Sequence, residues 1–381
     1  MNQKKILIVF GTRPEAIKMA PLITVFNDFK AQFDLKVCIT GQHKEILQQV
    51  LDFYEIYPDF DLKIMKQKQS LTEITSSILI EFGKIIRSIS PNLVIVHGDT
   101  STTFAATLAS FYEKIPIAHV EAGLRTNNIY NPWPEEANRR LTSSLAKYHF
   151  VPTVSNKSNL LKENINEDFI CITGNTVIDS LLYSKKMILN NASILEKVIR
   201  SIKIHYDIIE NKKYILITCH RRENFGDNLE NICGAIKKLA DNNHNVDFIY
   251  PVHPNPNIKD KVSVMLGNVK YIFLIPPVNY PSFIYLMDRS YFIISDSGGI
   301  QEEAPALGKP VLVIRESTER QEAVDSGTVE LVGTSKNKIF QVSNDLLHNE
   351  NKYLKMANAT NPYGKGTACK TIIRYLLDKL E

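Results

Sequence analysis

Four carboxylates in the first half of the sequence could carry out acid–base chemistry, and they are Asp99, Glu121, Glu135 and Glu136. Asp99 and Glu121 each follow a short apolar run that predicts a buried strand, where an uncompensated charge is costly. Glu135 and Glu136 begin a predicted helix, where they could instead complement the helix dipole. Adjacent helical residues point about 100° apart, so we expect only one of this pair to face a site. Carboxylates held close together have their pKa values pushed apart, as acid–base chemistry on sugars requires.

The segment Asp296-Ser297-Gly298-Gly299 could bind a phosphate group, because it ends a predicted strand and begins a predicted helix. Two glycines allow a phosphate to approach the backbone, and the exposed amides at a helix N-terminus favour an anion. A serine cap with glycines for close packing explains the same residues equally well. The segment has neither the G-x-G-x-x-G dinucleotide pattern nor a Walker loop, which disfavours nicotinamide, flavin and ATP as cofactors.

Arginines and one phenylalanine could complete a nucleotide site. The planar guanidinium of Arg13, of the Arg221-Arg222 pair or of Arg320 could bind phosphate oxygens, although a single arginine more often forms a surface ion pair. Phe283 precedes a predicted helix and could stack on a base, although such a phenylalanine more often belongs to the core.

Four histidines follow or lie near predicted strand ends, namely His97, His119, His220 and His253. They lack the H-x-x-x-H or similar spacing of a metal site. We therefore expect catalytic or supporting imidazoles and no metal.

The elements that would position these residues are short β-branched runs that alternate with segments of helical period. Predicted strands cover residues 5–10, 35–39, 93–97, 115–120, 214–218, 247–250, 269–274, 291–295 and 310–315. This alternation is typical of α/β proteins built from parallel βαβ units, in which ligands bind beyond the carboxyl ends of the strands. The candidate residues follow those ends, which predicts two Rossmann-like doubly wound domains that face a central cleft.

A lysine- and asparagine-rich helical stretch, residues 178–203, interrupts this alternation. We place the boundary between the two domains there. The first domain would comprise residues 1–177 and contain the catalytic carboxylates, and residues 178–365 would form the second. The amphipathic closing helix, residues 366–381, would pack back on the first domain.

Composition excludes several classes of protein. The chain has 381 residues, a formal net charge of +4, 44% hydrophobic residues and no long block of one charge, which argues against dedicated nucleic-acid or membrane-surface binding. Its five cysteines are odd in number and show no C-x-x-C spacing, as in a reduced cytoplasmic protein. The apolar run at residues 6–10 is too short for a signal peptide, and no stretch of ~18 apolar residues predicts a membrane span.

Six motifs in order along the chain resemble those of the non-hydrolysing UDP-N-acetylglucosamine 2-epimerases. They are GTRPEAIKMAP at 11–21, VHGDT at 96–100, HVEAGLRT at 119–126, PWPEEANR at 132–139, HRREN at 220–224 and DSGGIQEEAP at 296–305. The resemblance implies two Rossmann-like domains of the kind found in B-type glycosyltransferases, usually as a homodimer. It also implies interconversion of UDP-N-acetylglucosamine and UDP-N-acetylmannosamine through 2-acetamidoglucal and UDP, without a redox cofactor or metal.

The resemblance further implies roles for individual residues. The acid–base residues would be Asp99, Glu121, Glu135 and His220, with His220 near the departing diphosphate. The UDP-sugar would be bound by Arg13, Lys18, Arg139, Phe283, Ser297, Gly298, Gly299, Glu303 and Arg320. A second, activating molecule of UDP-N-acetylglucosamine would be bound by Gln42, His43, Lys68, Arg221 and His253, with Lys68 at a position where arginine is commoner.

Three positions depart from the family pattern: Asn127 replaces a usual glycine, Val154 a usual glutamate and Gln321 a usual proline. None is a proposed catalytic residue, so they bear on loop geometry and affinity.

The alternatives to an epimerase are a hydrolysing relative that releases N-acetylmannosamine, a B-type glycosyltransferase and a sugar-nucleotide sensor. The candidate activating residues argue against the first, and a sensor would not need four acid–base groups.

Overall fold

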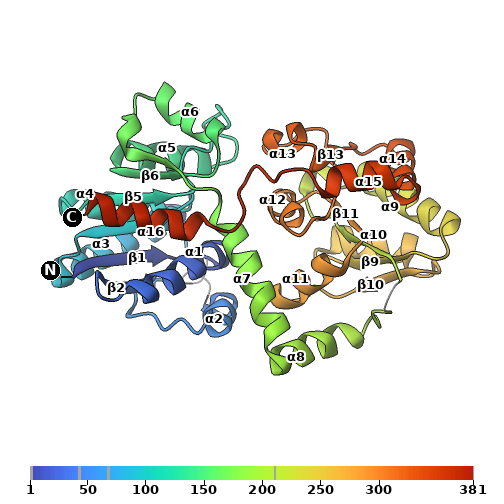
Figure 1. Ribbon diagram of the computed structural model, residues 1–381, viewed down its shortest axis with the longest axis horizontal. Helices are drawn as coiled ribbons and strands as arrows, with labels where there is room; N and C mark the ends of the chain where they lie inside the picture. Colours follow the sequence, from blue (N-terminus) through green and yellow to red (C-terminus); the bar gives the residue numbers. More distant parts are fainter. Residues whose placement is uncertain (1–2, 42–43, 67–68, 210–211, 381) are drawn as a thin grey trace. The chain divides into compact units, whose positions relative to one another are not determined.

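The structure is a computed structural model that describes residues 3–41, 44–66, 69–209 and 212–380. The chain divides into two compact units (Figure 1). Unit 1 comprises residues 1–180 and 363–381, and unit 2 comprises residues 181–362. The sequence suggested boundaries after residues 177 and 365, whereas the two units divide after residues 180 and 362.

Unit 1 contains a parallel sheet in the order β3-β2-β1-β4-β5-β6-β7. Its strands are β1 (Lys4–Phe10), β2 (Phe33–Ile39), β3 (Phe60–Asp61), β4 (Leu93–His97), β5 (Ile117–Val120), β6 (Tyr148–Val151) and β7 (Ile170–Ile172). Its helices are α1 (Arg13–Phe26), α2 (Lys44–Phe53), α3 (Leu71–Ile89), α4 (Ser101–Tyr112), α5 (Glu135–Leu145), α6 (Val154–Lys162) and α16 (Ala368–Lys379).

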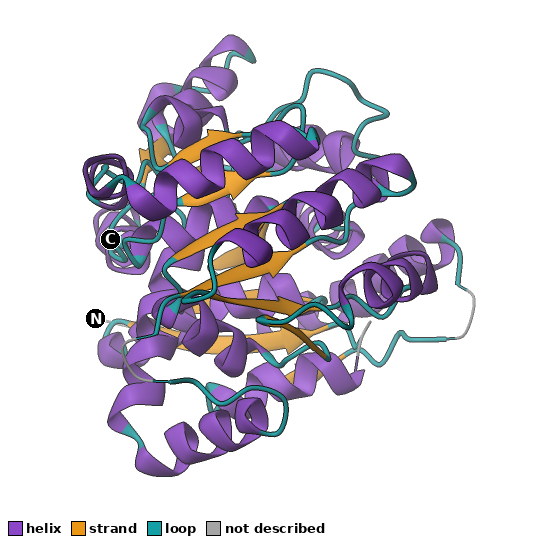
Figure 2. Ribbon diagram, turned by 90° about the vertical axis from the view of Figure 1, so that its right-hand side faces the viewer, coloured by secondary structure: helices purple, strands orange, loops and turns teal. Residues whose placement is uncertain are grey.

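Unit 2 contains a parallel sheet in the order β10-β9-β8-β11-β12-β13. Its strands are β8 (Tyr214–Thr218), β9 (Asp247–Pro251), β10 (Ile272–Ile275), β11 (Phe292–Ser295), β12 (Val311–Val313) and β13 (Val329–Leu331). Its helices are α8 (Ala192–Lys203), α9 (Asp227–Asn242), α10 (Pro256–Leu266), α11 (Tyr280–Arg289), α12 (Gly298–Ala306), α13 (Gln321–Asp325), α14 (Lys336–His348) and α15 (Glu350–Ala357). Figure 2 shows the strands lying between helices.

The prediction of two Rossmann-like doubly wound domains is confirmed by this topology. In both sheets the strand order reverses beside the first strand, between β1 and β4 in unit 1 and between β8 and β11 in unit 2. Such a reversal opens a crevice at the carboxyl ends of the two strands, where doubly wound proteins bind ligands. The polar segments singled out from the sequence therefore follow the strands on either side of each reversal.

The prediction missed β3, β6, β7 and β13, which have only two to four residues each. A run as short as Tyr148–Val151 carries too little pattern to stand out in the sequence, and its strand forms by pairing with β5 and β7. The predicted strand at 269–274 begins only at Ile272, and that at 310–315 ends at Val313.

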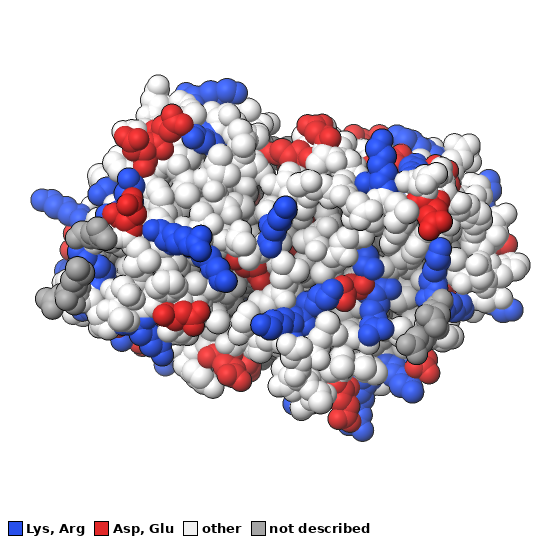
Figure 3. Space-filling view, in the orientation of Figure 1, with Lys and Arg blue, Asp and Glu red and all other residues white. Residues whose placement is uncertain are grey.

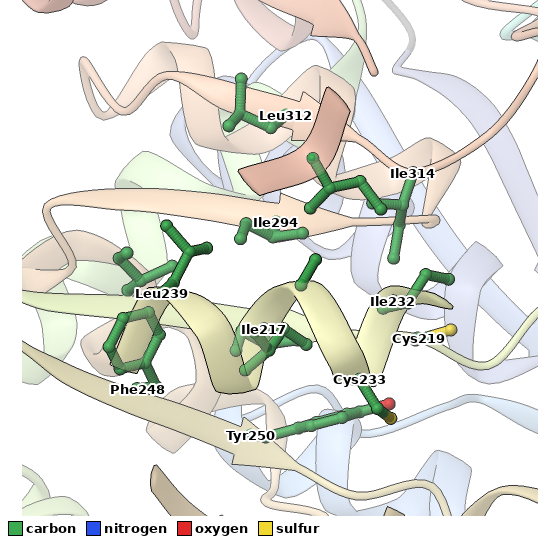
Figure 4. Close-up of a cluster of buried hydrophobic side chains, with 14 of the residues drawn as sticks. Ile217, Cys219, Ile232, Cys233, Leu239, Phe248, Tyr250, Ile294, Leu312 and Ile314 are labelled. Carbon is green, nitrogen blue, oxygen red and sulfur yellow. The ribbon is translucent and has the colours of Figure 1, made fainter. Parts of the chain in front are cut away.

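Apolar side chains between sheet and helices hold each unit together. In unit 2, α9 places Ile232, Cys233 and Leu239 in the same buried cluster as Ile217 and Phe248 of the sheet (Figure 4). These side chains are almost fully removed from water, and burying each contributes about 1.5–3 kcal/mol. This packing fixes the strand ends that carry the polar residues.

The helix α7 (Thr176–Asn190) takes the chain from unit 1 into unit 2, and α16 belongs to unit 1. Asp179 in α7 accepts hydrogen bonds from the backbone N–H groups of Ala368 (3.1 Å) and Cys369 (3.0 Å), at the start of α16. Further along α16, the ring of Tyr375 packs edge-on against Tyr148 and Phe150. The last helix is thereby fixed to the sheet of unit 1.

Surface charge, the cysteines and the hydropathy of the helices bear on the classes of protein considered from the sequence. On the face shown in Figure 3, basic and acidic side chains are interspersed over each unit. All five cysteines lie in the described residues and are free thiols. Within the described ranges, no helix is both long and apolar enough to cross a bilayer.

Candidate active site

The loops after β1 and β4 are joined by the buried carboxylate of Glu15. Its Oε2 accepts hydrogen bonds from the backbone N–H groups of Gly11 (3.0 Å) and Thr12 (2.7 Å). Its Oε1 accepts hydrogen bonds from the hydroxyls of Thr100 (2.6 Å) and Thr103 (3.2 Å). With Thr12 as the N-cap, this arrangement is a capping box that fixes the start of α1.

Arg13 is the first residue of α1 and is half-buried. A cation at the positive end of a helix is unfavourable unless an anion lies nearby. Among the residues that the structure describes, Arg13 has no recorded ion pair. Binding of an anionic ligand by its guanidinium stays a prediction from the sequence.

Glu121 directly follows β5 and adopts a backbone φ of +61°, which non-glycine residues rarely take up. Its Oε2 lies 2.5 Å from Lys18 Nζ and 3.7 Å from His97 Nε2, and accepts a hydrogen bond from Asn175 Nδ2 at 2.9 Å. Burial alone would raise the pKa of Glu121, but the charges of Lys18 and His97 together lower it well below its usual range. The carboxylate is therefore ionised.

Asp99 follows β4 and has a different environment. Arg139 Nη2 donates a hydrogen bond to Asp99 Oδ2 at 2.7 Å, and Asn138 Nδ2 donates to the Asp99 carbonyl oxygen at 2.9 Å. Burial raises the pKa of Asp99; Arg139 opposes this rise, whereas the charges of Glu121 and Glu135 add to it. Asp99 consequently holds a proton more readily than Glu121 does.

Glu135 and Glu136 begin α5 and have separate environments, as expected for adjacent helical residues. Glu136 is fully buried, and it accepts hydrogen bonds from the backbone N–H of Thr126 (3.0 Å) and from Arg140 Nε (2.9 Å). Arg139 Nη1 lies 3.5 Å from the same carboxylate. Glu136 is thus occupied in holding the loop and helix together, which leaves the half-buried Glu135 as the candidate acid–base residue.

Two histidines support this part of unit 1. His119 Nε2 is hydrogen-bonded to the carbonyl oxygen of Gly98 at 2.7 Å, and burial lowers the pKa of His119 to about 3. A neutral imidazole there supports the loop that carries Asp99. His97 instead faces Glu121, as described above.

In unit 2, a hollow of about 280 Å³ brings together five predicted site residues. They are His220, His253, Phe283, Ser297 and Glu303, and they come from the loops after β8 and β9 and from the ends of α11 and α12. The sequence analysis placed Phe283 before a helix, which is wrong. The helix α11 begins three residues earlier at Tyr280, because the Asn279 side chain accepts a hydrogen bond from the Ser282 N–H and caps it there.

His220 is held by the buried carboxylate of Asp296. The distance between His220 Nδ1 and Asp296 Oδ1 is 3.1 Å, and Asp296 Oδ2 accepts hydrogen bonds from the backbone N–H groups of His220 and Arg221, both at 2.8 Å. Burial alone would raise the pKa of Asp296, but His220 and these N–H groups lower it to about 2. The ionised Asp296 thus lies beside Nδ1 of His220, and no partner is recorded for Nε2 among the described residues.

The sequence left two explanations for the Ser-Gly-Gly segment: a phosphate site, or a serine cap with glycines for close packing. The start of α12 agrees with each of them in part. The Ser297 side chain makes no capping hydrogen bond, which contradicts the serine cap and leaves its hydroxyl beside the hollow. At Gly298, however, a Cβ atom would lie 3.0 Å from Cζ of Arg320, so this glycine does allow close packing. At Gly299 a Cβ would approach nothing closer than 3.8 Å.

Arg320 and Glu303 have partners within unit 2. Arg320 Nε donates a hydrogen bond to Glu302 Oε1 at 2.9 Å, and its Nη1 lies 3.6 Å from Glu319. Tyr280 donates its hydroxyl hydrogen bond to Glu303 Oε1 at 3.1 Å. Arg320 therefore has carboxylate partners, whereas Glu303 lines the hollow.

Of the five residues predicted for an activating site, Gln42, His43 and Lys68 lie outside the described residues. The exposed ring of His253 stacks on His220, with ring centroids 6.1 Å apart. Arg221 follows His220 directly, and its backbone N–H is bound by Asp296. The two described members of this group therefore adjoin the hollow that contains the predicted substrate residues.

The departures from the family pattern lie on loops and helix starts. Asn127 adopts a φ of +61°, which explains why glycine is usual there, and asparagine is among the few other residues that tolerate it. Val154 is an exposed first residue of α6, and Gln321 begins α13, where its amide donates to Asp325 at 2.9 Å.

Asn175 was not predicted as a site residue, although it binds Glu121. In the sequence it precedes a helical segment, and this type of residue at that position indicates only a helix cap. Asn175 and Glu121 follow different strands and meet only because those strands belong to the same sheet. A local sequence pattern cannot predict such a contact.

A larger hollow of about 660 Å³ lies elsewhere in unit 2, at the amino ends of β8 and β11. It contains none of the predicted site residues. In the described part of the chain, no group of three or more His, Cys, Asp or Glu side chains is arranged to hold a metal ion.

Comparisons with known proteins show which family and which solved structures this chain resembles. The family model described as UDP-N-acetylglucosamine 2-epimerase matches residues 27–377. A UDP-N-acetylglucosamine 2-epimerase of Campylobacter jejuni is 54% identical over 374 residues, covering 98% of this chain and 97% of the relative.

Solved structures give the same result. The crystal structure of UDP-GlcNAc 2-epimerase from Neisseria meningitidis, bound to UDP-GlcNAc, superposes with a TM-score of 0.88 at 50% identity, covering 98% of this chain and 100% of that chain. The Methanocaldococcus jannaschii enzyme in complex with UDP-GlcNAc and UDP has a TM-score of 0.79 at 33% identity, covering 98% of this chain and 99% of that chain.

Proposed function

The chain belongs to the UDP-N-acetylglucosamine 2-epimerase family, and on this basis we propose that it is a non-hydrolysing epimerase that interconverts UDP-N-acetylglucosamine and UDP-N-acetylmannosamine. The observation that carries the proposal is the pair Asp99 and Glu121, whose pKa values are moved in opposite directions by their surroundings. Glu121, ionised beside Lys18, is suited to accept a proton, and Asp99 is suited to donate one.

The reaction has two balanced steps. In the first, a carboxylate removes the proton from C2 of the sugar, the electron pair of the C–H bond forms a C1–C2 double bond, and UDP leaves C1 with the electrons of the C–O bond. The intermediates are 2-acetamidoglucal and UDP. In the second step UDP adds back to C1, and C2 receives a proton on the opposite face. The steps balance without an oxidant, a reductant or water, so we propose no cofactor.

The departing UDP carries negative charge that unit 2 is suited to stabilise. The N-terminus of α12 presents backbone N–H groups at Gly298 and Gly299, whereas the Ser297 N–H donates to Ser295 Oγ at 2.9 Å. His220 has Nε2 directed away from Asp296. In unit 1, Arg13 at the start of α1 would bind a phosphate oxygen in the same way. These donors act most strongly where charge develops in the transition state.

The remaining parts of the nucleotide have candidate partners in the 280 Å³ hollow. Phe283 would stack on uracil, and Glu303, oriented by Tyr280, would accept hydrogen bonds from the ribose hydroxyls. We also propose a cytoplasmic homodimer that is activated by a second molecule of UDP-N-acetylglucosamine. Binding of that molecule beside His253 would be consistent with the stacking of His253 on His220.

The test is incubation with UDP-N-acetylglucosamine in heavy water, followed by proton NMR of the sugar. We expect loss of the C2 proton signal together with the appearance of UDP-N-acetylmannosamine. Accumulation of free N-acetylmannosamine and UDP would instead identify a hydrolysing enzyme. A folded preparation that binds UDP but exchanges no C2 proton would contradict epimerase activity and leave a glycosyltransferase or a sensor.

A further inference from the structure

Asn175 makes three hydrogen bonds that connect distant parts of unit 1. Its side-chain Nδ2 donates to Glu121 Oε2 at 2.9 Å, and its backbone N–H donates to the carbonyl oxygen of Tyr363 at 2.8 Å. Its Oδ1 accepts a hydrogen bond from the backbone N–H of Val177 at 3.1 Å, in the first turn of α7. Only 3% of Asn175 is exposed, so these contacts are shielded from water.

The partners of Asn175 belong to both segments of chain that run between the two units. Helix α7 leaves unit 1 after Ser180, and Tyr363 is the first residue of the returning segment. Gly174 shows how closely the two segments approach, because a Cβ atom there would lie 2.9 Å from the Tyr363 carbonyl oxygen. Asn175 thus lies where the segment that leaves unit 1 and the segment that returns to it contact each other.

The bond to Glu121 determines which oxygen of that carboxylate is occupied. Lys18 Nζ, His97 Nε2 and Asn175 Nδ2 all approach Oε2. For Oε1, no partner is recorded in the part of the chain that the structure describes. The charge of this carboxylate in turn raises the pKa of Asp99. Oε1 is thus the oxygen that can accept a proton from a ligand.

We propose that Asn175 is a positioning residue for Glu121, which holds Oε2 so that Oε1 faces the substrate and which ties this carboxylate to the two inter-unit segments. The proposal rests on the proposed epimerase function for its kinetic consequences. Lys18 supplies charge to Glu121 and comes from α1, whereas Asn175 connects the carboxylate to α7 and to Tyr363. Asn175 acts through Glu121 and does not itself transfer a proton.

The test is Asn175→Asp, which keeps an oxygen to cap α7 and changes the donor that faces Glu121 into a second carboxylate. We expect the pKa of the Glu121 carboxyl to rise by about one unit or more, because a hydrogen-bond donor is lost and a like charge is added. This pKa is measured by ¹³C NMR titration of carboxyl-labelled protein, with the Glu121 signal assigned from Glu121→Gln. We expect the acid limb of the kcat profile to move upward equally and kcat to fall by up to about 100-fold, with KM within about twofold of wild type.

The matched control is Asn191→Asp, since Asn191 caps α8 through Ser193 and Ile194 and contacts no carboxylate in the recorded bonds. It should leave both titration and kinetics unchanged. If Asn175→Asp does not fold, Asn175→Ser keeps a capping hydroxyl, removes only the amide donor and should raise the pKa of Glu121 by a smaller amount. An unchanged Glu121 titration in the folded variant, or an equal shift in Asn191→Asp, would overturn the proposal.

The titration requires no turnover, so the two proposals can fail separately. A wild-type protein that does not epimerise would refute the proposed function while the NMR titration still decides the role of Asn175. A wild-type protein that epimerises, with an Asn175→Asp variant of identical pH profile, would refute the positioning role alone.

Discussion

His220 lies against the buried carboxylate of Asp296, with its imidazole Nδ1 3.1 Å from a carboxylate oxygen. The carboxylate is completely removed from solvent, and it also binds the backbone N–H groups at positions 220 and 221. A carboxylate beside an imidazole stabilises positive charge that develops on the ring during a reaction.

Replacing Asp296 with Asn should therefore lower kcat for epimerisation by about 100-fold, because His220 loses the negative charge beside its ring. The binding of UDP should weaken much less. Steady-state kinetics and calorimetric titration with UDP measure the two effects. Asp345→Asn is the control, since Asp345 pairs with Lys352 on the surface, and its kinetics should match wild type. An Asp296→Asn enzyme with wild-type kcat would exclude this role.

The same carboxylate predicts how stability depends on pH. The pKa of Asp296 is lowered from 3.8 to about 2 in the folded chain. A group with a depressed folded pKa stabilises the protein above its unfolded pKa, and this stabilisation is lost as the pH falls from about 4 to about 2. Asp296 should thus contribute on the order of 2 kcal/mol at pH 7. Urea unfolding of wild type and Asp296→Asn at pH 7 and pH 3 should show a smaller difference at pH 3; an equal difference would contradict the assignment.

Replacing Asp99 with Asn should remove proton exchange at C2 while the nucleotide still binds. General acid–base groups contribute about 100- to 10,000-fold, so exchange in heavy water should fall by that range. The affinity for UDP should stay within about threefold, since the nucleotide residues of unit 2 are unchanged. Glu81→Gln, which alters an exposed ion pair with Lys84, is the control and should leave exchange intact. If the Asp99→Asn variant still exchanges the C2 proton, another carboxylate must carry out this role.

Gly174→Ala should destabilise unit 1 more than a comparable substitution elsewhere. Gly174 has a φ of +83°, and its Cβ would lie 2.9 Å from a backbone oxygen. Gly327 has a φ of +78° but nothing within 4 Å of a Cβ, so Gly327→Ala isolates the conformational cost of about 1–2 kcal/mol. We expect Gly174→Ala to exceed this by about 1 kcal/mol or more. Chemical unfolding of both variants measures the difference, and equal losses would show that the contact with Tyr363 relaxes freely.

The sequence predicted most of the fold because apolar runs and helical periods are local properties. It also placed Asp99, Glu121 and His220 at strand ends, since position after a strand can be counted along the chain. Phe283 was placed outside a helix because nothing in its neighbourhood except the Asn279 cap marks where α11 begins.

Other features could not be predicted because they depend on tertiary contacts. Residue spacing alone could not choose between Glu135 and Glu136, and the family resemblance assigned the role to Glu135. The Thr126 N–H and Arg140, which bind Glu136, come from parts of the chain that only the fold brings together. The opposite pKa directions of Asp99 and Glu121 likewise follow from partners on other elements, Arg139 and Lys18. A pattern of residue types shows that such groups are present but not which pairs form.

The division of unit 1 into two stretches of sequence affects the order in which the protein can fold during synthesis. Unit 2 is continuous, and a ribosome completes it before residues 363–381 have been added. Unit 1 must wait for α16, whose Ile372, Ile373 and Leu376 are buried in the folded structure, so the apolar surface that receives them stays uncovered until α16 has been synthesised. The half of the protein that is made first is therefore the half that is finished last.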